Sequence, residues 1–214
     1  MRDGTATRTR IDQTALRLFV SKGVTETTIK DIARGARVAE GAMYRHYASK
    51  EDLVRRLFSS NYAAFGQALD KLQAGESGLQ QKIRAMVHGF CELYDSDPVS
   101  FRFLLLVQHE HLDKLTPEMQ SPVNVVRDVI AKAIRRKEIP RRDPEFLTAM
   151  VIGIVLQAAT FKIYGRLAKP LSGLADDLVA ACLRAIDGEG AAQRRPIRLR
   201  SHGASEAIDA GFGK

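Results

Sequence analysis

The chain has 214 residues, of which 45% are hydrophobic and 27% charged, and its net charge is +8. This length suffices for one or two domains with a real core, and no apolar run is long enough to span a membrane. The most apolar segment, residues 146–163, is interrupted by Thr148, Gln157, Thr160 and Lys162 and therefore predicts a buried helix. The N-terminus has arginines but lacks the apolar stretch of a secretory signal, so we expect a cytoplasmic protein with no membrane partner.

The positive charge is concentrated near the N-terminus. Residues 1–50 carry ten Lys and Arg against five Asp and Glu, whereas residues 51–188 carry eighteen against seventeen. An excess of positive charge favours a polyanionic partner such as DNA. A solvated surface could have the same composition, so the charge supports a DNA-binding interpretation without establishing it.

Residues 1–9 are polar, and we expect them to be mobile. Arg2, Arg8 and Arg10 could touch phosphates or the minor groove, as basic arms do, or could belong to a frayed terminus. A first helix is predicted from about Thr9 to Ser21.

The stretch from Thr28 to Leu53 predicts two short helices joined by a tight turn, followed by the start of a longer helix. Thr28 can cap the first of these two short helices, with Asp31 at the position of a capping-box acid. The chain turns near residues 37–38, and a second helix runs over about 39–46. Ser49 then caps the longer helix that follows.

The second of these helices presents mostly polar or small side chains: Glu40, Gly41, Tyr44, Arg45 and His46. A short helix that presents donors and acceptors, and is held by flanking helices, fits the geometry that enters a DNA major groove.

Four local motifs in this stretch make the interpretation specific. They are the I-A pair at 32–33, G-x-x-Y at 41–44, Y-R-H-Y at 44–47 and S-K-E-x-L at 49–53. The stretch thereby resembles the N-terminal domain of the tetracycline-repressor (TetR) family of bacterial transcription regulators. The sequence resemblance covers about the first quarter of the chain.

Two residues depart from the family pattern, which usually has Gly at the position of Arg37 and Ser or Thr at that of Ala39. A non-glycine residue in a left-handed turn costs on the order of 1 kcal/mol. Ala39 has no side-chain oxygen to cap the next helix, a loss of about 1 kcal/mol. We therefore expect a turn that is strained or shifted.

The resemblance implies roles for eight residues on double-stranded DNA. Phosphate contacts are expected from Thr28, Tyr44, His46 and Lys50. The residues expected nearest the base edges are Lys30, Glu40, Gly41 and Arg45, of which Arg45 is the best candidate for a guanine contact.

The rest of the chain also predicts helices, and no strand signal is present. The predicted ranges are about 50–73, 79–95, 97–112, 122–137, 143–166 and 172–186. The expected fold is all-α with about nine helices: a helix-turn-helix domain (1–50), a long fourth helix leading into an effector-binding and dimerisation domain (51–188), and a disordered basic tail (189–214).

No catalytic set and no metal motif is recognisable in the second half. His109 and His111 are two residues apart and point to different sides of a helix, and His88 with Cys91 gives only two potential ligands. We expect no enzyme activity, no metal and no cofactor.

A cavity for an unknown small-molecule effector is a further expectation, raised by the resemblance. The candidate lining residues are Phe90, Tyr94, Phe101, Phe103, His109, Phe161 and Tyr164. Each could equally belong to an ordinary core, since aromatic residues at helical spacing usually do.

Small and apolar residues recur at helical spacing in the last two helices. Such faces can pair with their symmetry mates as a four-helix bundle, and the resemblance implies a homodimer of this kind. The alternative is an ordinary monomer core. The candidate interface residues are Ile152, Leu156, Leu178 and Cys182.

The sequence therefore predicts a homodimeric repressor that a small molecule releases from a pseudo-palindromic operator. One alternative is an activator, or a regulator of the same fold controlled by another protein. Another is a helical small-molecule-binding protein or enzyme without specific DNA binding.

Overall fold

A computed structural model describes residues 2–111 and 121–188, and within these ranges the chain is helical without a strand. The helices are α1 (Arg2–Lys22), α2 (Ile29–Ala36), α3 (Glu40–Met43), α4 (Lys50–Ala74), α5 (Gly78–Ser96), α6 (Pro98–His111), α7 (Pro122–Arg135), α8 (Pro144–Ile163) and α9 (Ala175–Asp187), with a short 3₁₀ helix, η2 (Ser172–Leu174). The all-α prediction with about nine helices is confirmed. The predicted disordered tail lies outside the described residues, as does most of the predicted loop at 113–121.

Five helices begin at polar side chains that accept a hydrogen bond from the first turn. For α6, the Asp97 carboxylate accepts from the backbone N–H of Ser100 at 3.1 Å. Thr28 accepts from the backbone N–H of Asp31, and Ser49 from that of Asp52, both at 3.1 Å. Ser121 and Asp143 do the same for α7 and α8. Such caps satisfy N–H groups that have no partner inside the helix, which is why these starts could be located from sequence.

Four helices differ from the predicted ranges by three or more residues. α8 ends at Ile163 instead of about 166, and α9 begins at Ala175 instead of about 172, after η2. α1 begins at Arg2 instead of Thr9, and its added turns carry Arg8, whose Nε donates to the Tyr47 hydroxyl at 3.3 Å. α3 ends at Met43 instead of His46, because the chain turns there to bury Tyr47, which is 2% exposed.

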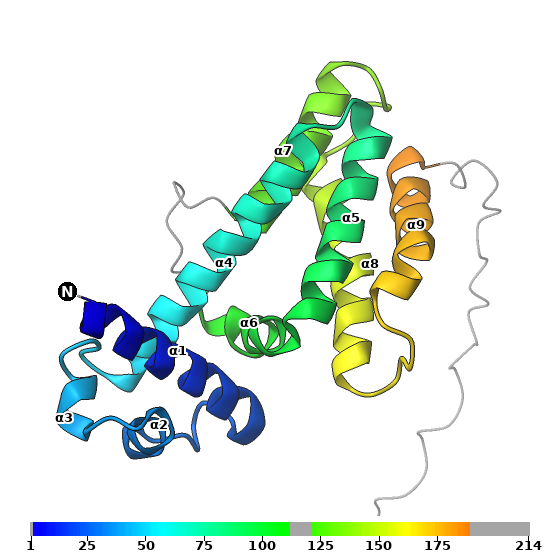
Figure 1. Cartoon of the computed structure of the whole chain (residues 1–214). Helices are drawn as coiled ribbons and strands as arrows, with labels where there is room; N and C mark the ends of the chain where they lie inside the picture. Colours follow the sequence, from blue (N-terminus) through cyan, green and yellow to red (C-terminus); the bar gives the residue numbers. More distant parts are fainter. Residues whose placement is uncertain (1, 112–120, 189–214) are drawn as a thin grey trace, which may run out of the picture.

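The buried residues form two cores, and Figure 1 shows α1, α2 and α3 as a group set apart from α5, α7, α8 and α9. We call the first unit the head: α1, α2, α3 and the first part of α4, to Tyr62, with Phe103, Leu104 and Val107 of α6 closing its core. The second, the body, consists of the rest of α4 with α5, α7, α8 and α9. α6 packs against α1 of the head and also against α4 and α5.

Polar contacts hold the loop between α8 and α9 against the end of α8 and the end of α5. Lys162 Nζ donates to the carbonyl oxygens of residues 167–169 at 2.9–3.1 Å. The Asp95 carboxylate accepts from the backbone N–H groups of Leu171 and Ser172 at 3.1 and 2.8 Å. These contacts fix where α9 starts.

Within the described ranges, α8 alone is long and apolar enough by length and composition to cross a membrane. It packs against α7 and α9 in the body, as a core helix does. The prediction of a buried helix holds for one side only, because Phe146, Phe161 and Tyr164 on α8 and just after it are 56%, 43% and 68% exposed.

Candidate DNA-binding surface and interior cavity

The start of α2 is fixed by a reciprocal pair of hydrogen bonds. The Thr28 hydroxyl accepts from the N–H of Asp31, and the Asp31 carboxylate accepts from the N–H of Thr28 at 3.2 Å. Lys22 Nζ lies 2.7 Å from the same carboxylate. The hydrogen bond from Lys22, and then those from Thr28, lower the pKa of Asp31 to about 2. The end of α2 that carries Thr28 and Lys30 is thus held rigidly.

The turn between α2 and α3 is strained, as its sequence predicts. Arg37 has φ 56° and ψ 49°, the left-handed conformation that glycine adopts most easily. The N–H groups of Arg37 and Val38 donate to the carbonyl oxygens of Arg34 and Ala33 at 3.2 and 3.0 Å. Ala39 makes no side-chain cap for α3.

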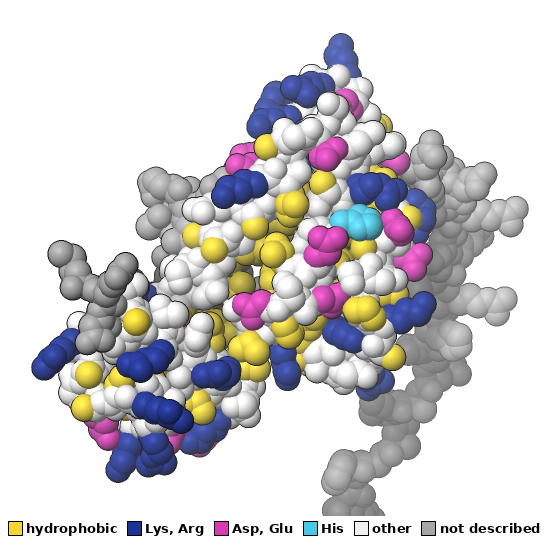
Figure 2. Space-filling model, viewed as in Figure 1, with side chains coloured by type: hydrophobic (Ala, Val, Ile, Leu, Met, Phe, Trp, Pro, Cys, Tyr) yellow, Lys and Arg dark blue, Asp and Glu magenta, His cyan; other side chains and the backbone are white. Residues whose placement is uncertain are grey.

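α3 turns one side inward and offers the other to solvent. Met43 is 1% exposed in the head core, whereas Tyr44 is 60% exposed. Glu40, Gly41 and Arg45 are also exposed. Figure 2 shows Lys and Arg side chains gathered over the end of the molecule formed by α1, α2 and α3. The predicted base-reading residues therefore occupy an accessible basic surface.

Two predicted phosphate contacts are less open than the rest. His46 is half-buried. Lys50 Nζ donates to the carbonyl oxygens of Val24 and Thr25 at 3.0 and 3.2 Å. An ammonium has three donors, so one remains for a phosphate while the other two hold the loop before α2.

A cluster of polar side chains around Tyr47 was not predicted from the sequence. The Tyr47 hydroxyl donates to the Asp12 carboxylate, and the guanidinium carbons of Arg8 and Arg56 each lie 5.8 Å from the centre of the Tyr47 ring. Burial, followed by the hydrogen bond with Asp12, raises the pKa of Tyr47 to about 12. These residues come from α1, α4 and the turn after α3, so no local pattern could have revealed the cluster.

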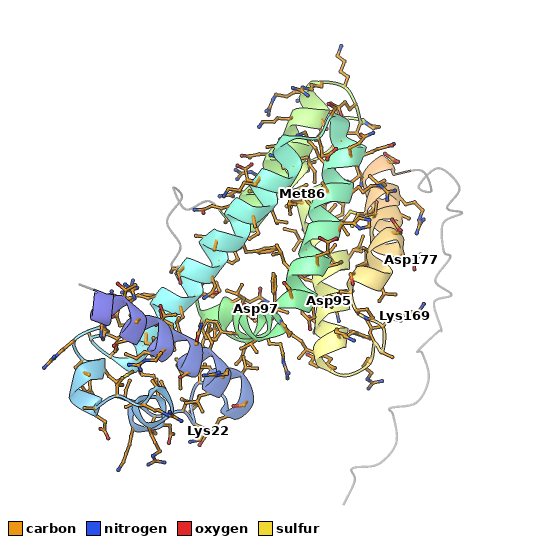
Figure 3. All side chains as sticks on the ribbon, in the orientation of Figure 1. Lys22, Met86, Asp95, Asp97, Lys169 and Asp177 are labelled. Carbon is orange, nitrogen blue, oxygen red and sulfur yellow. The ribbon has the colours of Figure 1, made fainter. Side chains whose placement is uncertain are left out.

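An apolar cavity of about 210 Å³ lies among α4, α5, α6, α7 and α8. Figure 3 shows side chains, Met86 among them, in the space between α4 and α5. Among the described residues of the lining, only Tyr62 and Gln108 carry polar side-chain groups, and none is charged. The lining residues are Phe58, Tyr62, Phe65, Leu69, Ile83, Met86, Val87, Phe90, Phe101, Leu104, Leu105, Gln108, Pro122, Val123, Val126, Val151, Ile152, Val155 and Leu156.

Only two of the seven residues predicted to line a cavity do so, Phe90 and Phe101. Tyr94 is buried behind them, with its ring centre 6.3 and 5.8 Å from theirs. Phe103 lies in the head core, stacked on Phe19 at 5.8 Å.

The remaining three predicted lining residues are on the surface. His109 is exposed, and so are Phe161 and Tyr164. Placing them around a cavity was wrong because helical spacing identifies an apolar face but not the element that the face packs against.

The four predicted interface residues also separate. Ile152 and Leu156 line the cavity, and Leu178 is partly buried against the body core. Cys182 is 0% exposed, and its thiol lies 3.9 Å from the Val151 carbonyl oxygen. Placing Cys182 on an interface was therefore wrong, because it belongs to the core between α8 and α9.

No group of three or more His, Cys, Asp or Glu side chains in residues 2–111 and 121–188 is arranged to hold a metal ion.

Comparisons with known proteins agree on one family. The profile described as "Bacterial regulatory proteins, tetR family" matches residues 11–57. The "Probable HTH-type transcriptional regulator ArpR" of Pseudomonas putida is 31% identical over 149 residues, which is 63% of this chain and 69% of that protein. The regulator SrpR of the same species is 26% identical over 141 residues, which is 63% of this chain and 64% of that protein.

Solved structures show the same fold. The transcriptional regulator FadR from Bacillus subtilis, solved in complex with stearoyl-CoA, superposes with a TM-score of 0.69 at 18% identity, covering 85% of this chain and 98% of that one. The fatty acid degradation regulator FadR from Bacillus halodurans gives 0.68 at 14% identity, covering 83% and 94%.

Proposed function

The chain belongs to the tetracycline-repressor (TetR) family and is a DNA-binding transcriptional regulator, and from this premise we propose that it is a homodimeric repressor released from its operator by a small apolar effector. The observation that carries the proposal is a set of shared side chains. Phe58, Tyr62 and Leu104 belong to the head core and also line the body cavity. A molecule in the cavity would therefore touch the support of the DNA-binding helices directly.

The proposed DNA contacts follow the exposed surface of the head. Lys30, Glu40, Gly41 and Arg45 are proposed to lie nearest the base edges, with the Arg45 guanidinium matching the two acceptors of guanine. Thr28, Tyr44, His46 and Lys50 are proposed to contact phosphates. Two heads would read half-sites about 34–36 Å apart or somewhat more in successive major grooves, in the cytoplasm, where bacterial DNA lies.

The exposed side of α8 supports a homodimer. Phe146, Gly153, Phe161 and Tyr164, on α8 and just after it, are exposed. Met150 and Ile154 are only partly buried against the body core. A helix that is apolar all round is normally covered on every side, and a large exposed apolar patch marks an interaction site. We propose that α8 and α9 pair with their copies in a second chain as a four-helix bundle.

The cavity supports an uncharged, mostly apolar effector. Charge buried without a partner is costly. The described residues of the lining offer no ionic partner, and Tyr62 and Gln108 alone among them can form side-chain hydrogen bonds. FadR from Bacillus subtilis, which has the same fold, was solved with stearoyl-CoA. For this chain an acyl chain would suit the lining, whereas the phosphates of coenzyme A would have to remain outside it.

The proposed route of release runs through α6. Phe101, Leu104 and Leu105 face the cavity, while Phe103 stacks on Phe19 of α1. A ligand that alters the position of α6 would alter the position of α1 and the separation of the two heads. Binding is coupled to DNA release only if the ligand prefers one separation.

The deciding experiment is selection of the purified protein against random duplexes at physiological salt, followed by sequencing. We expect one inverted repeat, from which uncharged apolar compounds, but not charged ones of similar size, release the protein. Arg45→Ala should lower operator affinity by about 1–3 kcal/mol and relax base preference at one position. Recovery of no shared sequence, with binding that vanishes as salt rises, would contradict the proposal.

A further inference from the structure

A second, shallow cleft lies on the head, away from the interior cavity. It has a volume of about 260 Å³ and separates α1 from the turn that follows α2. Its lining consists of Arg10, Gln13, Thr14 and Arg17 from α1, of Gly35 and Ala36 at the end of α2, and of Arg37 in the turn. The two segments lie close together, since a Cβ added to Gly35 would be 2.6 Å from the Thr14 methyl group.

Three guanidinium groups line this cleft without a carboxylate among them. Within the described part of the chain, Arg10, Arg17 and Arg37 form no ion pair, although exposed arginines elsewhere do. Arg10 and Arg17 make only long contacts of 3.5 Å, to the hydroxyls of Thr7 and Thr14. Like charges held together without a counterion favour the binding of an anion, and a guanidinium matches phosphate oxygens well.

The backbone provides an independent indication. Arg37 occupies a left-handed conformation that destabilises any residue other than glycine. Residues held in such conformations cluster at functional sites. Arg37 combines this strained backbone with a place in the lining of a cleft that holds two other arginines, as a residue of a binding site does.

The position of the cleft indicates the source of the anion. Arg37 lies three residues before Glu40, where α3 begins. A helix inserted in a major groove has phosphates of the two strands on either side, and residues next to its start are close to one of them. We infer that Arg10, Arg17 and Arg37 form a phosphate-binding cleft that grips the DNA backbone beside α3. This inference rests on the proposed function of the head.

The test separates the charge of Arg37 from its backbone strain. Arg37→Ala removes the charge and keeps most of the strain, whereas Arg37→Gly removes both. Lys137 offers a matched control, because it is exposed, basic and left-handed (φ 60°) but lies after α7, in the body. Each variant is measured by binding to the duplex selected by the wild type and to a random duplex of equal length across a salt series, and by thermal unfolding.

We expect both Arg37 variants to weaken binding to both duplexes by roughly tenfold, as the loss of a charge-assisted contact does. The slope of log affinity against log salt should fall by about 1 per subunit. Of the two Arg37 variants, only Arg37→Gly should raise the unfolding temperature, by about 2 °C, and Lys137→Gly should raise it similarly because it relieves the same left-handed conformation. Lys137→Ala and Lys137→Gly should leave DNA binding unchanged.

Two outcomes would overturn the inference. If Arg37→Ala binds DNA like the wild type, the charge is not used on the backbone. If inorganic pyrophosphate stabilises the wild type but not Arg37→Ala while DNA affinity is unaltered, the cleft serves a free phosphate compound instead. Specific binding of the wild type to the selected duplex tests the proposed function separately, so failure of one is distinguishable from failure of the other.

Discussion

The head and the body are both helical, but different contacts hold them together. In the head, polar contacts fix the chain at particular atoms: the Thr28–Asp31 pair, the Ser49 cap and the contacts of Lys50 with the loop before α2. In the body, the packing is mainly apolar and leaves a cavity of about 210 Å³. Hydrogen bonds demand a distance and a direction, whereas apolar contact is non-directional. Under the proposed function, the head would keep one DNA-binding surface while the body adapts to an effector.

The largest expected effect is on assembly through the body. Gly153 is exposed in the middle of α8, and an added Cβ would meet nothing within 4 Å. Gly153→Glu should favour the monomer's helix by about 1 kcal/mol while placing one carboxylate from each copy in the proposed interface, at several kcal/mol per ion. Sedimentation should show a monomer with an intact fold. Gly153→Ala, which adds helix propensity without charge, should remain dimeric; a dimeric Gly153→Glu would disprove this interface.

A single residue tests where the boundary between the two regions lies. Phe103 follows the cavity residue Phe101 closely in sequence but is 0% exposed in the head core. Phe103→Ala should lower the free energy of unfolding by about 3–5 kcal/mol, measured by urea titration, without changing the uptake of a neutral apolar dye by the cavity.

The matched variant is Phe90→Ala, at a residue that lines the cavity. It should change dye uptake directly. Equal effects of the two variants on the dye would show that Phe103 faces the cavity after all.

The contribution of polar caps to the stability of the head can be tested through a smaller effect. Ala39 has the extended conformation of an N-cap (φ −69°, ψ 146°) but no side-chain oxygen. Ala39→Ser should add a hydrogen bond at the start of α3 and raise the free energy of unfolding by about 1 kcal/mol. Ala39→Val provides the control without a cap, and a stabilisation as large as that of Ser would refute a capping mechanism.

The smallest expected effect is the pH dependence of the capping pair. The hydrogen bond from Lys22 lowers the pKa of Asp31 from 3.8 to about 2 in the folded chain. The contribution of the ionised Asp31 carboxylate to stability is therefore fully present above the pKa of Asp31 in the unfolded chain. It is lost as pH falls from about 4 to 2. The difference in unfolding temperature between wild type and Asp31→Asn should shrink over that range. Lys22→Met should reduce this difference in unfolding temperature at neutral pH. A difference in unfolding temperature that does not depend on pH would contradict an ionic origin of the stabilisation.

The head could be predicted closely because its signals are local. Thr28 and Ser49 mark helix starts through atoms three residues away, and the departure at Arg37 indicated the strained turn that the structure contains. The Tyr47 cluster could not be predicted, because it joins Asp12 and Arg56 across distant parts of the chain.

The sequence by itself determined that the chain is helical, where the capped helices begin and which side of α3 is exposed, since each depends on residues within a turn or two of one another. The tertiary structure alone decided which apolar side chains form a wall, a core or an outer face. It moved Phe103 into the head, Cys182 into the body core and Ile152 onto the cavity. The reason is physical: helical periodicity shows that a face is apolar, but burial is non-directional, so only the packing of distant helices decides what that face meets.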